Sequence, residues 1–135
     1  MIKTESLIHT MKQNKIDGYL LPRNNMFISE DIHPAENKIM KLCGFSGSAG
    51  TLLIIREGKS YLFVDGRYEL QAPEETDSTE VEVICTTKIS MYDWMRANLP
   101  EGFKLGLNPQ TISIAEYSKL QNKLPQIKIY AIEEL

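Results

Sequence analysis

A pair of short apolar runs, separated by a glycine-containing turn, constrains the fold of this chain more than any other feature. The runs are Thr51–Ile55 and residues 61–64, and Glu57-Gly58 stands between them. Two such runs joined by a tight turn predict a β-hairpin. Apolar residues outnumber polar ones on both strands, so we expect the hairpin to lie centrally in a sheet that is covered on both faces.

Segments with strand and helix patterns alternate on both sides of this hairpin. Apolar spacing and capping residues predict helices over residues 4–14, 35–42, 67–72, 90–98 and 113–124. Further strands are predicted over residues 19–21, 81–85, 104–107 and 127–132. We expect Pro73 to end the helix before it and an acidic loop to begin at Glu74. The alternation indicates an α/β fold, with a mixed sheet of about six strands flanked by helices.

The length, composition and net charge of the chain limit its possible functions. A chain of 135 residues is long enough for a single domain, residues 1–135, with a real core. A net charge of −3 argues against nucleic-acid binding through bulk charge. No apolar run approaches the ~20 residues of a membrane span, and the polar N-terminus is unlike a signal peptide. We therefore expect a cytoplasmic protein in which Cys43 and Cys85 are buried, reduced thiols.

A glycine-rich segment, Gly-Phe-Ser-Gly-Ser-Ala-Gly-Thr at residues 44–51, precedes the hairpin. Glycine-rich loops bind phosphate when they open a helix. This one lacks the Lys-Ser/Thr pair of a P-loop and leads into a strand. A tight backbone turn is the favoured interpretation.

Two groups of acidic residues are candidate metal sites. The spacing of Glu30, Asp31, His33 and Glu36 could supply hard ligands, but without a second histidine an acidic helix start is favoured.

The second group contains Asp65, Glu69 and Asp77. An acidic residue on a central strand resembles the two-magnesium arrangement of ribonuclease H-like nucleases. Because Asp65 stands at the end of its strand, directly before Gly66, a helix N-cap fits it better than a metal ligand.

Arg67 is the candidate binding residue. An arginine directly after a core strand is held by a rigid scaffold, and its planar guanidinium suits a carboxylate or a carbonyl oxygen. The alternative is a salt bridge to Asp65 or to a neighbouring glutamate, and the residues alone leave both open. His9 is expected on the polar face of the first helix. The residues themselves therefore predict no catalytic centre.

Two motifs in order carry a resemblance to a known family. They are the glycine-rich segment at residues 44–51 and Asp-Gly-Arg-Tyr-Glu-Leu-Gln-Ala at residues 65–72. Together they resemble the N-terminal domain of Xaa-Pro aminopeptidases, which is of the creatinase/prolidase type. Weaker agreement at residues 18–22 and 99–107 extends the resemblance across the chain.

The resemblance implies a function for a larger protein. Enzymes of this family remove the N-terminal residue before a proline, using two divalent ions, usually manganese, held in a C-terminal catalytic domain that these residues lack. It implies that the present chain is catalytically inactive alone and contributes no catalytic or metal-binding residue. It also implies that Arg67 contacts the Xaa-Pro peptide, and that the domain meets its downstream domains, shapes access to the cleft and takes part in a homodimer. The apolar triplet Met26-Phe27-Ile28 is a candidate for such packing.

Other assignments stay open. The same type of domain could belong to a prolidase or a creatinase-like hydrolase, or serve as a stand-alone binding module. No nucleic-acid or membrane partner is expected under any of the family assignments.

Overall fold

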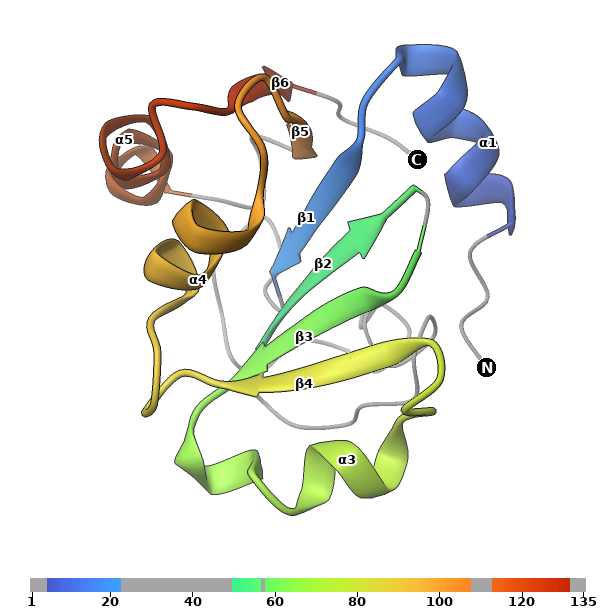
Figure 1. Ribbon diagram of the computed structural model, residues 1–135, viewed down its shortest axis with the longest axis vertical. Coiled ribbons are helices and arrows are strands. Elements are labelled where there is room, and N and C mark those ends of the chain that lie inside the picture. The colour runs from blue at the N-terminus through green and yellow to red at the C-terminus, as the bar shows by residue number, and fades with distance from the viewer. Residues whose placement is uncertain (1–4, 23–49, 57, 108–112, 132–135) are drawn as a thin grey trace.

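The structure, a computed structural model, describes residues 5–22, 50–56, 58–107 and 113–131 (Figure 1). The described residues form a six-stranded sheet in the order β4-β3-β2-β1-β5-β6. Its strands are β1 Gly18–Pro22, β2 Thr51–Ile55, β3 Ser60–Val64, β4 Val81–Cys85, β5 Lys104–Leu107 and β6 Lys128–Ala131. The predicted α/β fold with a mixed, six-stranded sheet is thereby confirmed.

The strand directions create one edge at which most strands end. Strand β2 runs antiparallel to both of its neighbours, β1 and β3, whereas the pairs β3–β4, β1–β5 and β5–β6 are parallel. Five of the described strands therefore have their carboxyl ends at the same edge of the sheet. In α/β sheets this is the edge at which ligands usually bind.

Helices cover both faces of the sheet, as expected for a central hairpin. Successive side chains of a strand point to opposite faces, so Leu52 and Ile54 belong to one core cluster and Leu53 to the other. On the first face Leu52 and Ile54 pack with Met11 of α1 (Glu5–Asn14) and Ala72 of α3 (Gln71–Glu75).

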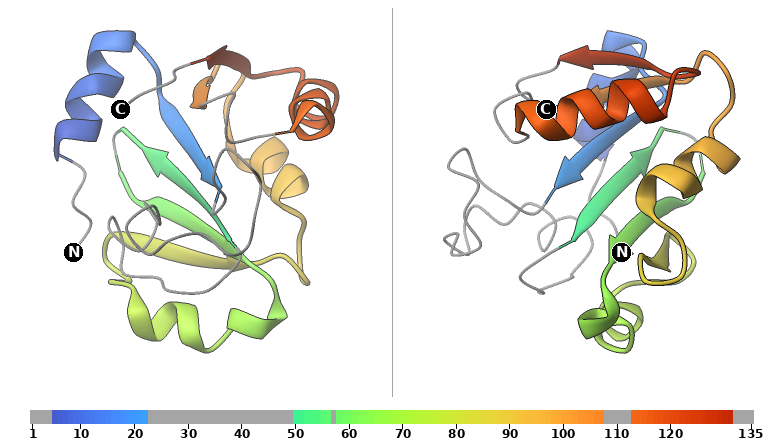
Figure 2. Two further views of the ribbon diagram at one scale, coloured as in Figure 1. Left: turned by 180° about the vertical axis from the view of Figure 1, so that it is seen from behind. Right: turned by 90° about the vertical axis from the view of Figure 1, so that its left-hand side faces the viewer.

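The second face is covered by α4 (Met91–Asn98) and α5 (Ile114–Lys123), which lie on the side facing the viewer in the right-hand panel of Figure 2. Both helices begin where their capping residues predicted. The Ser90 hydroxyl accepts a hydrogen bond from the backbone N–H of Asp93, at 3.1 Å. The Ser113 hydroxyl accepts one from the backbone N–H of Glu116, also at 3.1 Å.

The prediction of a helix over residues 67–72 that ends at Pro73 is wrong. The chain instead forms a short 3₁₀ helix, η2 Gly66–Tyr68, followed by α3 Gln71–Glu75, which contains Pro73. Pro73 is the third residue of α3, where a backbone N–H has no acceptor within the helix, so its missing N–H removes no helical hydrogen bond. The acidic loop predicted to begin at Glu74 accordingly begins after α3.

Candidate functional site

The candidate site lies at the carboxyl end of β3, where η2 follows directly. Asp65 has an extended backbone, and its carboxylate accepts a hydrogen bond from the backbone N–H of Arg67 at 2.9 Å. This is the helix N-cap that the sequence predicted. The next residue, Tyr68, is buried in the core of the first face. With Asp65 capping the turn and Tyr68 anchoring it, the turn directs the Arg67 side chain outward.

The Arg67 guanidinium forms a close ion pair with Asp65. Its Nε lies 3.2 Å from both carboxylate oxygens, and its Nη2 lies 2.9 Å from Oδ2. The guanidinium carbon also lies 5.2 Å from the centre of the Tyr68 ring, within the range of a cation–π contact. The salt bridge to Asp65, one of the two possibilities that the sequence left open, is present. Since 60% of the Arg67 side chain remains exposed, the pair is accessible to a ligand.

The hydrogen bonds from Arg67 hold the pKa of Asp65 below its usual value. The carboxylate is therefore charged at neutral pH and remains an acceptor for the guanidinium. A second exposed ion pair joins Glu69, at the end of η2, to Lys88 in the segment after β4, where Lys88 Nζ is 3.2 Å from Glu69 Oε1. Isolated ion pairs this exposed contribute little to the free energy of unfolding, so the fold gains little stability from either pair.

The three acidic residues of the nuclease alternative do not form one site. Glu69 pairs with Lys88, and Asp65 pairs with Arg67. Asp77 precedes β4, which is parallel to β3, so Asp77 lies at the opposite edge of the sheet from Asp65. There its carboxylate accepts hydrogen bonds from the Thr79 hydroxyl and backbone N–H, which lower the pKa of Asp77. Among the described residues, no group of three or more His, Cys, Asp or Glu could hold a metal ion.

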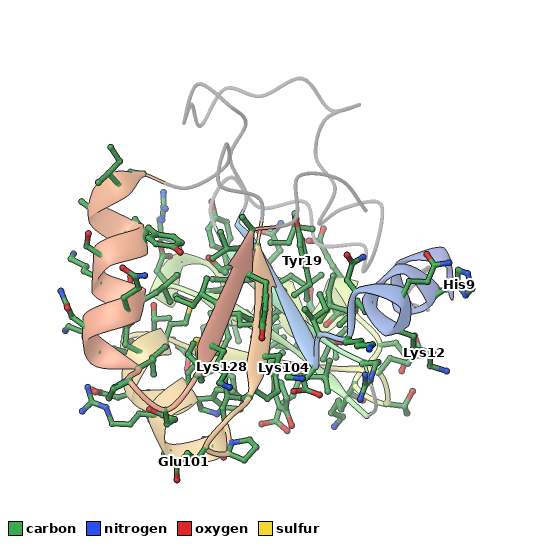
Figure 3. The ribbon with its side chains drawn as sticks, turned by 90° about the horizontal axis from the view of Figure 1, so that it is seen from above. His9, Lys12, Tyr19, Glu101, Lys104 and Lys128 are labelled. Carbon is green, nitrogen blue, oxygen red and sulfur yellow. The ribbon has the colours of Figure 1, made fainter. Side chains whose placement is uncertain are left out.

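Several predicted features fall elsewhere. His9 is exposed on α1 and points away from the sheet (Figure 3), as predicted. Cys85 is a free thiol, but it is half-buried rather than buried, because β4 is an edge strand. Other candidates lie outside the described residues: Cys43, the Met26-Phe27-Ile28 triplet, the Glu30, Asp31, His33 and Glu36 group, the helix over residues 35–42, and residues 44–49 of the glycine-rich motif.

Sequence reasoning missed a polar cluster at the amino edge of β1 and β5. The Asp17 carboxylate accepts a hydrogen bond from the Lys104 backbone N–H at 2.9 Å and a longer one, 3.4 Å, from Arg56 Nη2. It borders an open hollow of about 290 Å³ that Phe103 and Glu101 also line. Figure 3 shows Lys104 and Lys128, which are paired in register on neighbouring strands, along this edge. The sequence signal at Asp17-Gly18 indicated only the end of a helix.

Comparison with protein families shows which family the chain belongs to. The model of the creatinase/prolidase N-terminal domain matches residues 3–135. The chain belongs to the creatinase/prolidase N-terminal domain family. Curated relatives of this creatinase-type domain include a probable Xaa-Pro aminopeptidase P of Arthroderma otae, which is 33% identical over 120 residues and aligns with 84% of this chain and 18% of its own. Xaa-Pro aminopeptidase 1 of Dictyostelium discoideum is 30% identical over 129 residues. That alignment covers 94% of this chain and 20% of the length of the Dictyostelium protein.

Solved structures agree with this assignment. The X-prolyl aminopeptidase of Caenorhabditis elegans, described as a cytosolic enzyme with a di-nuclear active site, superposes with a TM-score of 0.87 at 25% identity, covering 98% of this chain and 23% of that one. The N-terminal domain of a putative metallopeptidase from Corynebacterium diphtheriae shares the fold, with a TM-score of 0.70 at 18% identity and 93% of that chain covered. The present creatinase-type domain spans about a fifth of the length of the curated relatives it matches.

Every helix within the described residues is too short or too polar to span a bilayer.

Proposed function

We propose that this chain is the non-catalytic N-terminal domain of an Xaa-Pro aminopeptidase and that Arg67 binds the peptide substrate. The observation that carries the proposal is the position of Arg67. It lies in the Asp-Gly-Arg-Tyr motif, directly after a buried strand, at the carboxyl edge of the sheet, with its guanidinium exposed. The relatives named above support the substrate class, because both carry the name Xaa-Pro aminopeptidase.

The chemistry available to Arg67 is binding and orientation. A guanidinium donates charge-assisted hydrogen bonds to a peptide carbonyl or carboxylate oxygen and stays protonated at any physiological pH. It supplies neither a nucleophile nor a general base. We therefore expect the 135-residue chain to hydrolyse no peptide by itself. Cleavage would require the remaining length of a full-size protein, with two metal ions that we propose to be manganese.

The finer parts of the proposal rest on the family. We propose that the full-size protein is cytoplasmic and homodimeric and that this domain contacts the domains downstream of it. The description of the C. elegans enzyme as cytosolic supports the first of these. Sequencing the gene beyond codon 135 tests whether this chain is one domain of a larger peptidase. A downstream domain with two Asp, one His and two Glu ligands is the expected result, whereas a stop codon would leave the stand-alone binding module as the function to test.

The Arg67→Ala variant of the full-length protein tests the role of the side chain. We expect kcat/KM for an Xaa-Pro tripeptide to fall about ten- to a hundredfold, since a hydrogen bond to a charged group contributes about 1.5–3 kcal/mol. The measurement is steady-state hydrolysis over a range of peptide concentrations. A prolidase would instead cleave Xaa-Pro dipeptides and reject the tripeptide.

Lys59→Ala is the matched control for this variant. It also removes one exposed cation, which lies 4.0 Å from Glu82, but near the opposite edge of the sheet. Its kinetics are expected to match those of the unmodified protein, and its unfolding transition should match that of Arg67→Ala. If Arg67→Ala hydrolyses the tripeptide as fast as the unmodified protein does, Arg67 has no part in substrate binding.

A further inference from the structure

We propose that Asp65 is a positioning residue: its carboxylate holds one edge of the Arg67 guanidinium so that the other edge faces the peptide substrate. This inference rests on the proposed role of Arg67 in substrate binding. It assigns to Asp65 a task beyond capping the turn, because a cap requires one hydrogen bond to a backbone N–H, and Asp65 makes three more to the guanidinium.

The geometry defines which edge is held. A guanidinium presents a side edge formed by Nε and Nη2 and an end edge formed by Nη1 and Nη2. Asp65 accepts from Nε at 3.2 Å and from Nη2 at 2.9 Å, so it occupies the side edge. The N–H groups of the end edge point away from Asp65. Their parallel directions match the oxygens of a peptide carbonyl or carboxylate.

We call the Asp65 carboxylate and the Arg67 guanidinium that it holds the clamp. This clamp is fixed to the core. Asp65 follows Val64, a buried residue of β3, whose carbonyl accepts a hydrogen bond from the Thr86 backbone N–H of the neighbouring strand end at 2.7 Å. Buried Tyr68 anchors the turn on the other side of Arg67, and its ring lies beneath the guanidinium. Arg67 is therefore held at both its backbone and its terminal group. A side chain held in this way loses less rotamer freedom when it binds a ligand.

The Asp65→Asn variant separates the clamp from the cap. The amide oxygen of asparagine can still accept from the Arg67 backbone N–H and from Nε. The amide nitrogen that replaces Oδ2 cannot accept from Nε or Nη2, so the guanidinium loses two of its three hydrogen bonds while the cap persists. In the full-length protein we expect KM for an Xaa-Pro tripeptide to rise about three- to tenfold, the cost of immobilising one long side chain, with kcat within about twofold. Asp65→Ser, which retains a capping oxygen, should give the same result and guards against an effect peculiar to asparagine.

Two controls make the result specific. Asp77→Asn removes the charge from another carboxylate that accepts a backbone N–H two residues on, at the far edge of the sheet, and should leave KM unchanged. Adding Asp65→Asn to Arg67→Ala should cause no further change, because the clamp then has nothing to hold.

A readout independent of activity uses the 135-residue chain itself. A domain of this fold from C. diphtheriae has been crystallised separately from the rest of its protein, which supports work on the isolated chain. In ¹⁵N nuclear magnetic resonance spectra, the Arg67 Nε–H signal should be protected from exchange with water in the unmodified chain. It should lose that protection in Asp65→Ser, which lacks both carboxylate oxygens, while the backbone signal of Arg67 persists.

The outcomes separate the two proposals. If Arg67→Ala impairs hydrolysis but Asp65→Asn and Asp65→Ser leave KM and the Nε–H signal unchanged, the positioning role of Asp65 is overturned and the role of Arg67 stands. If the Nε–H signal changes but neither Arg67→Ala nor Asp65→Asn alters KM, the clamp exists without serving substrate binding, and both proposals fail.

Discussion

Replacing Trp94 with alanine is expected to lower the free energy of unfolding by about 3–5 kcal/mol, the usual loss for a large aromatic side chain in a core. Trp94 joins α4 to the sheet and is only 9% exposed. Its ring centre lies 4.4 Å from that of Tyr61 and 5.3 Å from that of Phe63. The variant therefore loses two aromatic contacts on β3 as well as buried area. Urea denaturation followed by far-ultraviolet circular dichroism measures the change.

Two further variants control for this effect. Trp94→Phe keeps a ring at the same place and should lose clearly less stability than Trp94→Ala. Tyr130→Ala removes an aromatic side chain that is 41% exposed on β6 and should change the free energy of unfolding by less than about 1 kcal/mol. Equal losses for Trp94→Ala and Tyr130→Ala would show that α4 does not depend on the Trp94 contacts.

Gly18→Ala is expected to destabilise the domain by about 1–3 kcal/mol through overpacking. Gly18 begins β1 and is buried beneath an aromatic ring. A Cβ atom at this position would lie 2.7 Å from Phe103 Cζ and 3.2 Å from the Ile54 carbonyl oxygen. The Phe103 ring cannot simply bend away as a long flexible side chain could, so the ring or the strand must shift. The midpoint of thermal unfolding should fall accordingly.

Gly66→Ala makes the same chemical change where there is room for it. There the new Cβ would lie 3.5 Å from Thr87 Cγ2, an ordinary contact distance. Its unfolding midpoint should stay close to that of the unmodified chain. If both variants unfold at the same temperature as the unmodified chain, the close approach of Phe103 to Gly18 has no energetic consequence.

The parts of the fold that were predicted well depend on short-range patterns. Thr51–Ile55 and Val81–Cys85 form strands at the predicted bounds because turn residues border each apolar run. Ser113 begins its helix where the capping pattern indicated, since its partner N–H is only three residues away. Pro73 misled the prediction because a proline is compatible with a first helical turn, and only the position of the helix start reveals whether it lies there.

In the candidate site, too, the contacts between residues close in sequence were predictable and the others were not. Asp65 and Arg67 are two residues apart, so their pairing was among the predicted possibilities. The direction of the guanidinium and its contact with the Tyr68 ring could be learned only from the structure. Asp17 meets Arg56 and Lys104 across separations of 39 and 87 residues. Such contacts depend on which strands become neighbours, and no local pattern in the sequence encodes them.

The position of β1 in the sheet has a consequence for synthesis on the ribosome. Strand β1 emerges first, yet one of its neighbours, β5, is the fifth of the described strands to be made. Until residue 107 has emerged, β2 is the one neighbour among the described strands with which β1 of a nascent chain can pair, and the side of β1 that β5 will occupy still lacks that partner. Open strand edges attract other chains, and pairings between distant segments form slowly. The interval between the emergence of β2 and that of β5 is therefore the period in which the growing chain is most exposed to aggregation and gains most from a chaperone.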